Sequence, residues 1–441
     1  MKHVLAWSMA AAMAVAQDRG PLQLSLRRAV EIATSPEGST QIQLSQEALK
    51  QAELRSKEAR AALLPDLESA FLYQNRTANL AAQGITLTRV PFPGFAFPTF
   101  VGPFNTMDAR ITASQNVLNL SSIRQYQASK AGVSAAKSDS ETSGEQVAAL
   151  VARAYLAAVR ADTDVETAQA NVMLSGAVLT QAQDQKTAGT GTGIEVTRAR
   201  VQLANDQQRL LVTQNERKAA HLRLLRAMGL RLDTELQLSD RLKYEPVDAT
   251  TLEQARAQAL KDRPDYKAQQ EREANARLIA SATALERMPT LAALGDYGSS
   301  GAGFSKVLPT RTYGISLKVP LFDGARRDAR RAESASQRRA EQVRTNDLRE
   351  QIELDVRLAL DALSSAQDEV MVARDGLDLA ENELEQARRR YQAGVSDSLE
   401  VTDAQTRLER ARDNQTAALY NYSVARVDLA QAMGEVRRMI P

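Results

Sequence analysis

The fold of this chain is decided by residues 391–404, which read YQAGVSDSLEVTDA. On both sides of this stretch, apolar or small residues recur in steps of three and four, the heptad spacing of helices that pack along a seam. They are Leu363, Ala366, Val370, Ala373, Leu377, Ala380, Leu384, Ala387 and Tyr391 before it, and Val401, Ala404, Leu408, Ala411, Ala418, Tyr422, Ala425, Leu429 and Ala432 after it. Gly394 supplies the backbone freedom that a tight reversal needs. The sequence therefore predicts a helical hairpin whose tip carries Glu400 and Asp403.

The same tip occurs earlier in the chain. Gly394 aligns with Gly189 and Glu400 with Glu195, and both of the helices that follow end in Ala-Met-Gly. The identity between the two copies is modest, but the matches preserve the heptad phase and the turn glycine. This pattern predicts an internal duplication.

The composition is that of long paired helices. Only 4% of the 441 residues are aromatic, which is too few for several conventional globular cores. Lys and Arg total 56 against 54 Asp and Glu, so no large positive field points to a nucleic acid partner. The chain has no cysteine, which excludes disulfides, thiolate metal sites and a lipid-modified N-terminal cysteine.

Residues 1–16 have the features of a signal peptide. Lys2 and His3 precede an apolar run, and Ala14-Val15-Ala16 forms a small-x-small cleavage site. A buried N-terminal helix is the alternative interpretation. No later stretch offers the ~18 continuous apolar residues that a spanning helix needs. We therefore expect an exported protein whose insertion into a membrane uses strands.

Two pairs of alternating segments predict β-hairpins, at about 66–117 and about 290–319. Their strands approach the ~9–11 residues that a tilted transmembrane strand needs. The first hairpin has a long loop, residues 77–106, with five of the chain's eight phenylalanines: Phe92, Phe95, Phe97, Phe100 and Phe104. A disordered linker is not expected to be so aromatic. The loop either lies at a lipid interface or pore mouth, or simply packs against its neighbours.

The order helix, β-hairpin, long helix and return helix occurs twice. We expect a first repeat over 17–230 with its tip near 189, an equatorial linker over 231–264, and a second repeat over 265–441 with its tip near 394. A helix of ~65 residues is roughly 100 Å long, far beyond one globular domain. Four strands per chain cannot close a barrel, and open strand edges are not tolerated in lipid. Several copies must therefore share one barrel that continues into a helical tube.

The sequence resembles the TolC-like outer-membrane efflux protein family (outer membrane factors) over essentially the whole mature chain. The resemblance rests on Val319-Pro320-Leu321-Phe322-Asp323-Gly324, on Arg263-Pro264-Asp265, on the tip motif at 391–403, and on Ala432-Met433-Gly434, in this order on duplicated halves. It implies a mainly α fold with transmembrane β strands, in which a homotrimer forms a 12-stranded β-barrel continuous with a periplasmic α-helical barrel.

The resemblance also implies the function, location and partners. The protein would be the outer-membrane exit duct of a tripartite efflux or type I secretion system. It would contact outer-membrane lipid and dock to a periplasmic adaptor (membrane fusion) protein and an inner-membrane pump, passing small molecules or polypeptides out of the cell. The cargo, the adaptor and the pump do not follow from the sequence.

Roles for the tip residues follow from the same resemblance. Glu400 and Asp403 would lie at a narrow periplasmic entrance, where copies of each form carboxylate rings that favour cations. Tyr391 and Glu195 would take part in closing contacts, and Gly189 and Gly394 would form turns at the adaptor contact. A well-known family member has an arginine that links neighbouring chains at the position where this chain has Ser396. In this chain, Arg198 or the arginines at 388–390 would have to take over that link.

Each of these residues also has a structural interpretation. Glu195, Glu400 and Asp403 lie in the first turn of a helix, where acids interact favourably with the helix dipole. Tyr391 fits a heptad core position, and the arginines at 388–390 fit a solvated helix end. The sequence leaves both interpretations open.

Two other classes of function compete with a duct. An enzyme is disfavoured because His221 would be the sole histidine after cleavage, and the glycine-rich segment 189–193 follows a helix and precedes no lysine. We predict no catalytic residue, no metal ligand and no cofactor. An exported coiled-coil scaffold without a pore is the second alternative. It explains the heptads but not the two matching strand hairpins.

Overall fold

The computed structural model of the chain describes residues 21–84, 98–247, 250–396 and 398–439. The expected signal peptide lies outside the described residues, as do Phe92, Phe95 and Phe97 of the aromatic loop. The chain forms two compact units. The sheet unit comprises Glu47–Ser140 and Pro264–Arg349, and the hairpin unit comprises Met1–Gln46, Glu141–Arg263 and Glu350–Pro441.

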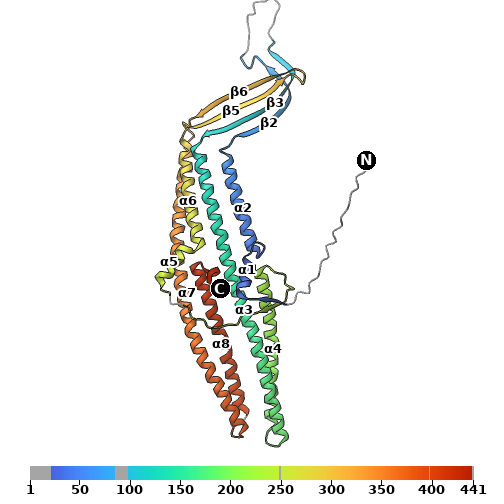
Figure 1. Cartoon of the computed structure of the whole chain (residues 1–441). Coiled ribbons are helices and arrows are strands. Elements are labelled where there is room, and N and C mark those ends of the chain that lie inside the picture. The colour runs from blue at the N-terminus through green and yellow to red at the C-terminus, as the bar shows by residue number, and fades with distance from the viewer. Residues whose placement is uncertain (1–20, 85–97, 248–249, 397, 440–441) are drawn as a thin grey trace, which may run out of the picture. The chain divides into compact units, whose positions relative to one another are not determined.

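The sheet unit contains one four-stranded antiparallel sheet (Figure 1). Its strands are β2 (Asp66–Asn79), β3 (Phe100–Leu118), β5 (Thr290–Gly301) and β6 (Val307–Lys318), in the spatial order β2-β3-β5-β6. The central pairing of β3 with β5 joins a strand of the first repeat to one of the second. The compact units therefore cut across the sequence repeats.

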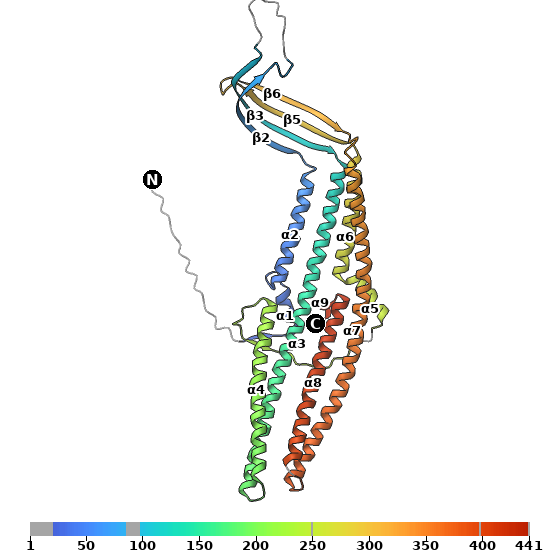
Figure 2. The ribbon, with the colours of Figure 1, turned by 180° about the vertical axis from the view of Figure 1, so that it is seen from behind.

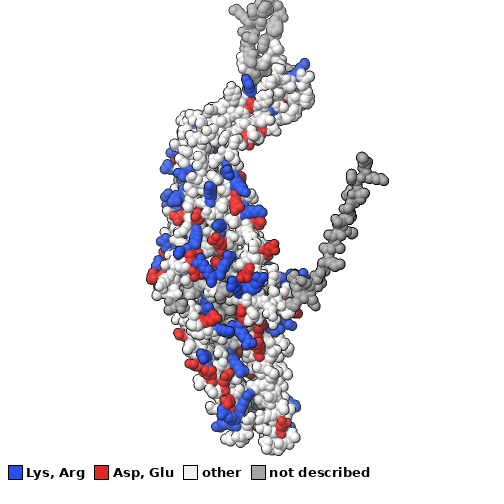
Figure 3. Space-filling model, in the orientation of Figure 1, with Lys and Arg blue, Asp and Glu red and all other residues white. Residues whose placement is uncertain are grey.

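The sheet has one polar face and one apolar face. Directly paired residues share a face, and successive residues alternate between faces. One line across the sheet pairs Glu68 with Thr112, Thr112 with Asp296 and Asp296 with Thr312. The opposite face collects large apolar side chains, which include Leu67, Phe71, Tyr73, Met107, Ile111, Tyr297, Tyr313, Ile315 and Leu317. Figure 3 shows few charged side chains on the visible surface of the sheet.

The strands are longer than the sequence predicts. The loop expected at 77–106 is shortened at both ends because β2 continues to Asn79 and β3 begins at Phe100. In the second hairpin, Ser299, Ser300 and Gly301 of β5 also pair with β6. Their small side chains indicate a loop in the sequence, but ladder hydrogen bonds depend on the backbone. A Cβ at position 301 would lie 2.0 Å from the carbonyl oxygen of Lys306. Because glycine has no Cβ, the backbone can approach this closely at the turn.

Two very long helices, α3 (Leu120–Thr187) and α7 (Arg326–Gln392), contribute to both units. Neither contains proline, and the prolines that precede them lie outside the helices. In the sheet unit they accompany α2 (Thr40–Ala61) and α6 (Pro264–Ala284), which ends in a short 3-10 turn at Leu285–Arg287. Polar contacts connect α6 to both: Arg272 bonds Asp139 of α3 at 2.6 Å, and Gln269 bonds Glu341 of α7 at 2.9 Å.

The hairpin unit is built on two helical hairpins, visible side by side in Figures 1 and 2. The first joins α3 to α4 (Gly193–Met228) and the second joins α7 to α8 (Ser398–Met433). The remaining helices are α1 (Leu26–Thr34), α5 (Leu252–Asp262) and α9 (Val436–Met439). The core at their base buries Leu24, Tyr155, Leu224, Met228 and Val427, among others.

The hairpin unit also contains a two-stranded parallel sheet, which the sequence does not predict. Residues Leu22–Leu24 form β1, which pairs with β4 (Leu236–Leu238) of the linker. Three residues are too few to show strand alternation, although both strands read Leu-Gln-Leu. Ser25 caps the next helix, because its hydroxyl accepts a hydrogen bond from the Arg28 amide. Among the described residues, no helix is both long and apolar enough to span a membrane.

We predict that Gly229→Ala destabilises the hairpin unit. Gly229 caps α4 with φ at +75°, and an added Cβ would lie 2.8 Å from the Gly38 carbonyl oxygen. The left-handed backbone alone costs a non-glycine residue ~1–2 kcal/mol.

Gly176→Ala is the matched control, because Gly176 lies inside α3 with open space around its Cα, where alanine is favoured by up to ~1 kcal/mol. Thermal unfolding followed by far-UV circular dichroism measures the difference. Equal melting temperatures for the two variants would contradict this assignment.

Candidate functional site at the helical tips

The two tip turns have the same backbone construction. Gly189 and Gly394 have φ angles of +78° and +70°. In each turn the amide after the glycine bonds the carbonyl five residues earlier, Thr190 to Gln185 at 2.9 Å and Val395 to Arg390 at 3.0 Å. This is the bonding of a glycine-terminated helix end. An added Cβ would meet no atom at either glycine, so the left-handed backbone, and not crowding, requires glycine there.

Tyr391 connects the two tips. It is only 6% exposed and packs among Leu384, Ala387, Val401 and Ala404. Its hydroxyl donates a hydrogen bond to the side-chain oxygen of Gln185 on the other hairpin. Burial and the nearby Glu195 carboxylate raise the pKa of Tyr391, so its hydroxyl keeps its proton. Tyr391 is therefore both a heptad core residue and a link between hairpins.

Glu195 lies in the first turn of α4 and has a structural role. Its carboxylate accepts a hydrogen bond of 2.7 Å from the Thr192 amide and completes a capping box with the Thr192 side chain. Such a box satisfies amides that the first turn of a helix leaves without partners. The same carboxylate is close enough to act on the pKa of Tyr391, so Glu195, Gln185 and Tyr391 form one group.

Glu400 and Asp403 lie in a second group, on the α7–α8 hairpin. Both line a concavity of about 490 Å³ near the tip, together with Glu383, Arg390 and Arg407. Arg390 pairs with Glu400 at 3.0 Å across the hairpin, and Arg407 pairs with Glu383. The Arg390 and Glu400 side chains are 57% and 40% exposed, so this pair adds at most ~1 kcal/mol to stability. The concavity holds three carboxylates and two guanidinium groups.

Two of the arginines proposed to substitute for an arginine at position 396 have partners inside this chain. Arg390 bonds Glu400, and Arg389 pairs with Glu385 of the same helix at 2.6 Å. The hydroxyl of Ser396 is buried without a hydrogen-bond partner among the described residues. The described structure therefore uses Arg390 to connect α7 with α8.

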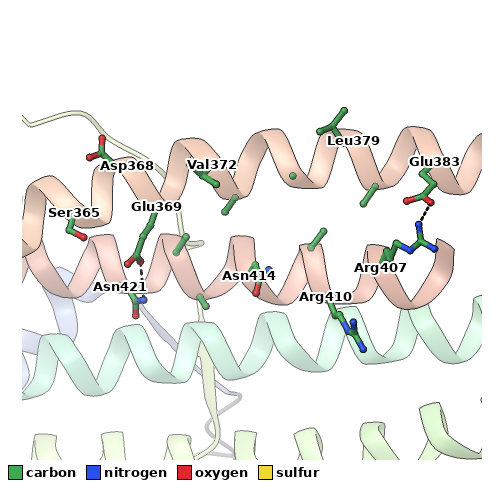
Figure 4. A pocket seen from close by; sticks show the side chains of 16 residues that line it. Ser365, Asp368, Glu369, Val372, Leu379, Glu383, Arg407, Arg410, Asn414 and Asn421 are labelled. Atoms are coloured by element: carbon green, nitrogen blue, oxygen red, sulfur yellow. Dashed lines mark hydrogen bonds and ion pairs between the residues drawn. The ribbon is translucent and has the colours of Figure 1, made fainter. Parts of the chain in front are cut away.

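A longer groove continues along the same hairpin (Figure 4). It has a volume of about 870 Å³, with Val372 and Leu379 on its margin at 72% and 71% exposure. The ion pair of Glu383 with Arg407 lies toward the tip, and Asn421 donates to Glu369 at 3.4 Å toward the base. Small residues such as Ala373 and Gly376 open the groove between the two helices.

Sequence reasoning missed several residues that shape the tips. Gln185, Glu383 and Arg407 were not singled out, although Arg407 follows Asp403 by four residues on the same helix face. No sequence signal pairs Gln185 with Tyr391, because that contact depends on how the two hairpins pack. The described residues contain no group of His, Cys, Asp and Glu that could hold a metal ion.

The chain combines two long helical hairpins with an antiparallel sheet that has one polar face, one apolar face and two outer edges. This combination is typical of outer-membrane channel proteins. The family model of the outer membrane efflux proteins matches residues 35–230 and 255–435. The chain belongs to this family. It is located in the outer membrane and serves as an exit duct for an efflux or secretion system. Members of the family are channels and not enzymes.

Individual relatives agree with this membership. The chain is 24% identical to the pyoverdine export outer membrane protein OpmQ of Pseudomonas putida, over 75% of this chain and 70% of that protein. It is 23% identical to the alkaline protease secretion protein AprF of Pseudomonas aeruginosa, over 83% of this chain and 76% of that protein. Its fold is similar to that of the CmeC outer membrane channel of Campylobacter jejuni, with a TM-score of 0.79, 16% identity, and coverage of 93% and 85% of the two chains.

We predict that Tyr391→Phe loosens the contact between the tips while the hairpins remain folded. The lost hydrogen bond contributes about 0.5–1.5 kcal/mol, so amide exchange around residues 185–195 and 391–401 should accelerate roughly twofold to tenfold. Tyr420→Phe is the control, since the Tyr420 ring lies under the Arg160 guanidinium at 5.2 Å and phenylalanine keeps that contact. Hydrogen exchange measured by mass spectrometry distinguishes the two. Similar exchange at the tips in both variants would remove the linking role.

Proposed function

We propose that three copies of this chain form one 12-stranded β-barrel continuous with a periplasmic α-helical barrel. The observation that carries the proposal is the sheet order β2-β3-β5-β6, in which the outer edges of β2 and β6 have no strand partner among the described residues. Open edges leave backbone groups without partners, at a cost of several kcal/mol each in lipid. Edge pairing between copies satisfies those groups, and the family resemblance supports three copies.

The two faces of the sheet support the same arrangement. The apolar face supplies a lipid-facing surface, with Tyr313 and Ile315 exposed to 82% and 75% in the isolated chain. The polar face then lines the lumen, where Arg110 bonds Asp108 and lies 3.5 Å from Asp296. An outward apolar band with a polar interior is the pattern of outer-membrane barrels.

The helical tips are proposed as the periplasmic gate. Glu400 and Asp403 would form carboxylate rings at the constriction, and the group of Tyr391, Glu195 and Gln185 would hold it closed. Gly189 and Gly394 form the turns that a periplasmic adaptor protein would contact. Rings of carboxylates attract cations and concentrate them at a pore entrance. The capping and ion-pair roles of Glu195 and Glu400 are compatible with this, because both carboxylates lie at the tips.

A periplasmic adaptor and an inner-membrane pump are the proposed partners, and the duct itself needs no catalytic residue or cofactor. The names of the two relatives assign pyoverdine export to one and alkaline protease secretion to the other. At similar identity to this chain, they indicate small-molecule and polypeptide cargo respectively. The pump would therefore select the cargo, and the duct would accept what the pump delivers.

The barrel predicts a face-specific response to charge. Ile315→Lys places a charge on the apolar face, which costs ~2–4 kcal/mol near the middle of a bilayer. It should reduce the heat-modifiable trimer extracted with detergent from outer-membrane fractions. Ser316→Lys, on the polar face one residue away, should not. Native mass spectrometry of the extracted protein should give three chains per particle. Extraction of the wild type in aqueous buffer would instead favour the coiled-coil scaffold.

The gate predicts that Glu400→Ala with Asp403→Ala weakens block by multivalent cations in planar bilayers. Removing six carboxylates from a trimer's entrance lowers the local concentration of the blocking ion. Block should weaken at least several-fold, with single-channel conductance retained. The control is Asp233→Ala with Glu235→Ala, which removes as many charges from the linker. Unchanged block in the tip variant would exclude the carboxylate rings.

A further inference from the structure

The seam between the two hairpins contains a polar layer. Toward the base, the main core includes Val159, Ala220 and Val427. Toward the tips, separate apolar clusters include Leu408 with Tyr391 and Val196 with Ala199. Between these regions α3 still buries Val165 and Ala168. Facing it, however, α4 buries Asp206 and Thr213, which are 6% and 3% exposed.

This layer surrounds a cavity of about 270 Å³ where α3, α4 and α8 meet. These helices lie next to one another in both ribbon views (Figures 1 and 2). Four carboxylates and two guanidinium groups line it: Asp164 from α3, Asp206 and Arg209 from α4, and Glu409, Arg410 and Asp413 from α8. The fully ionised cavity therefore has an excess of two negative charges. Asp206 is buried and Asp164 and Glu409 are half-buried, whereas Arg209, Arg410 and Asp413 are exposed. Carboxylates close together and partly shielded from water disfavour the packed arrangement unless protons or counterions reduce their charge.

Arg209 and Arg160 form their ion pairs with carboxylates other than Glu409. Arg209 pairs with Asp413 at 3.5 Å and Arg160 with Asp164 at 3.8 Å, while Gln202 donates to Asp206 at 2.9 Å. The pKa of Glu409 is raised to about 7, mainly by burial and then by the charges of Asp206 and Asp413, whose effect exceeds the opposing effect of Arg209 and Arg412. Burial also raises the pKa of Asp206 and of Asp164.

We propose that this polar layer is a proton-operated latch, in which uptake of a proton by Glu409 holds α8 against α3 and α4, and loss of that proton favours separation of the two hairpins. The cavity, the missing apolar packing on α4 and the charge excess all place the weak point of the seam at this layer. The consequence for gating rests on the proposed function of the tips. The proton dependence of hairpin separation itself does not.

The direction of the pH effect follows from the two states of Glu409. Its carboxyl binds a proton more tightly in the packed seam, where the pKa is about 7, than in a hydrated, separated seam, where it takes its ordinary value of 4.5. The packed state is therefore favoured as the pH falls through 7, and loses this stabilisation as the pH rises. Between pH 8 and pH 6 the ratio of packed to separated hairpins should increase about tenfold.

Distances between spin labels on the two tips, measured by double electron–electron resonance, test the latch directly. The chain has no cysteine, so Ala188→Cys and Val395→Cys, both on exposed tip residues, introduce the sole labelling sites. Labelled chains are diluted with unlabelled ones so that intrachain distances dominate. In detergent, the long-distance population relative to the short one should increase about tenfold from pH 6 to pH 8. A wild-type distribution that does not change with pH overturns the proposal.

Three variants in the labelled background separate the latch from a general effect of pH. Glu409→Gln imitates the protonated carboxyl, keeps the packed state and should abolish the response. Asp206→Asn removes one repelling charge and should move the midpoint to lower pH. Glu385→Gln is the control, because Glu385 is 64% exposed and pairs with Arg389 within α7; its response should equal the wild type's. An unchanged response in Glu409→Gln rejects the latch.

Bilayer conductance of the same proteins distinguishes the two proposals. If the wild type conducts but its tip distances ignore pH, the latch fails and the duct stands. If distances respond as expected but no channel forms, the proposed assembly fails and the latch stands.

Discussion

The pairing of β3 with β5 is the interaction on which the rest of this structure depends. It joins the two repeats along a ladder that runs from the pair Met107 and Gly301 to the pair Leu118 and Leu291. Two β-hairpins that would each be only marginally stable thereby form one sheet. Isolated two-stranded hairpins are barely stable in water. The register also brings Glu68, Thr112, Asp296 and Thr312 onto one face and the aromatic and aliphatic residues onto the other. A shift by one residue would exchange the faces.

The helical part of the chain follows a different rule. Its seams are made mainly of alanine, leucine and valine, and small residues let helices approach closely with little apolar area per contact. Such seams tolerate local polar substitutions because no single contact dominates. In α4, the buried polar residues Asp206 and Thr213 lie between the apolar core at the base of the hairpins and the apolar clusters at their tips. A polar layer between two packed regions is where neighbouring helices separate at least cost.

At the tips, the side chains proposed to act in the gate also have structural roles. Glu195 caps a helix, Tyr391 fills a heptad position and Glu400 bonds Arg390. A helix N-terminus attracts carboxylates, and a tight turn between helices places that N-terminus at the end of the hairpin. The same geometry therefore concentrates acidic groups at the tips of the hairpins. Structural need and channel function do not exclude one another here.

Much of this protein could be predicted from its sequence because the deciding signals are local and repeated. The heptads on either side of Gly394, the matching tip at Gly189 and the proline-free runs determine long hairpins, since helix periodicity is a property of consecutive residues. The order of motifs indicated the family, which the family model confirms. The weaker strand alternation still located both hairpins, but Gly and Ser residues hid the strand ends near Gly301.

Other features required the tertiary structure. The short β1–β4 pair joins Leu22–Leu24 to Leu236–Leu238, and no local pattern connects segments so far apart. The bond from Tyr391 to Gln185 and the gathering of Asp164, Asp206 and Glu409 around one cavity likewise depend on which helix faces meet. A sequence states which side chains lie on each face of a helix. Only packing decides which faces lie opposite each other, and therefore which charges are buried together.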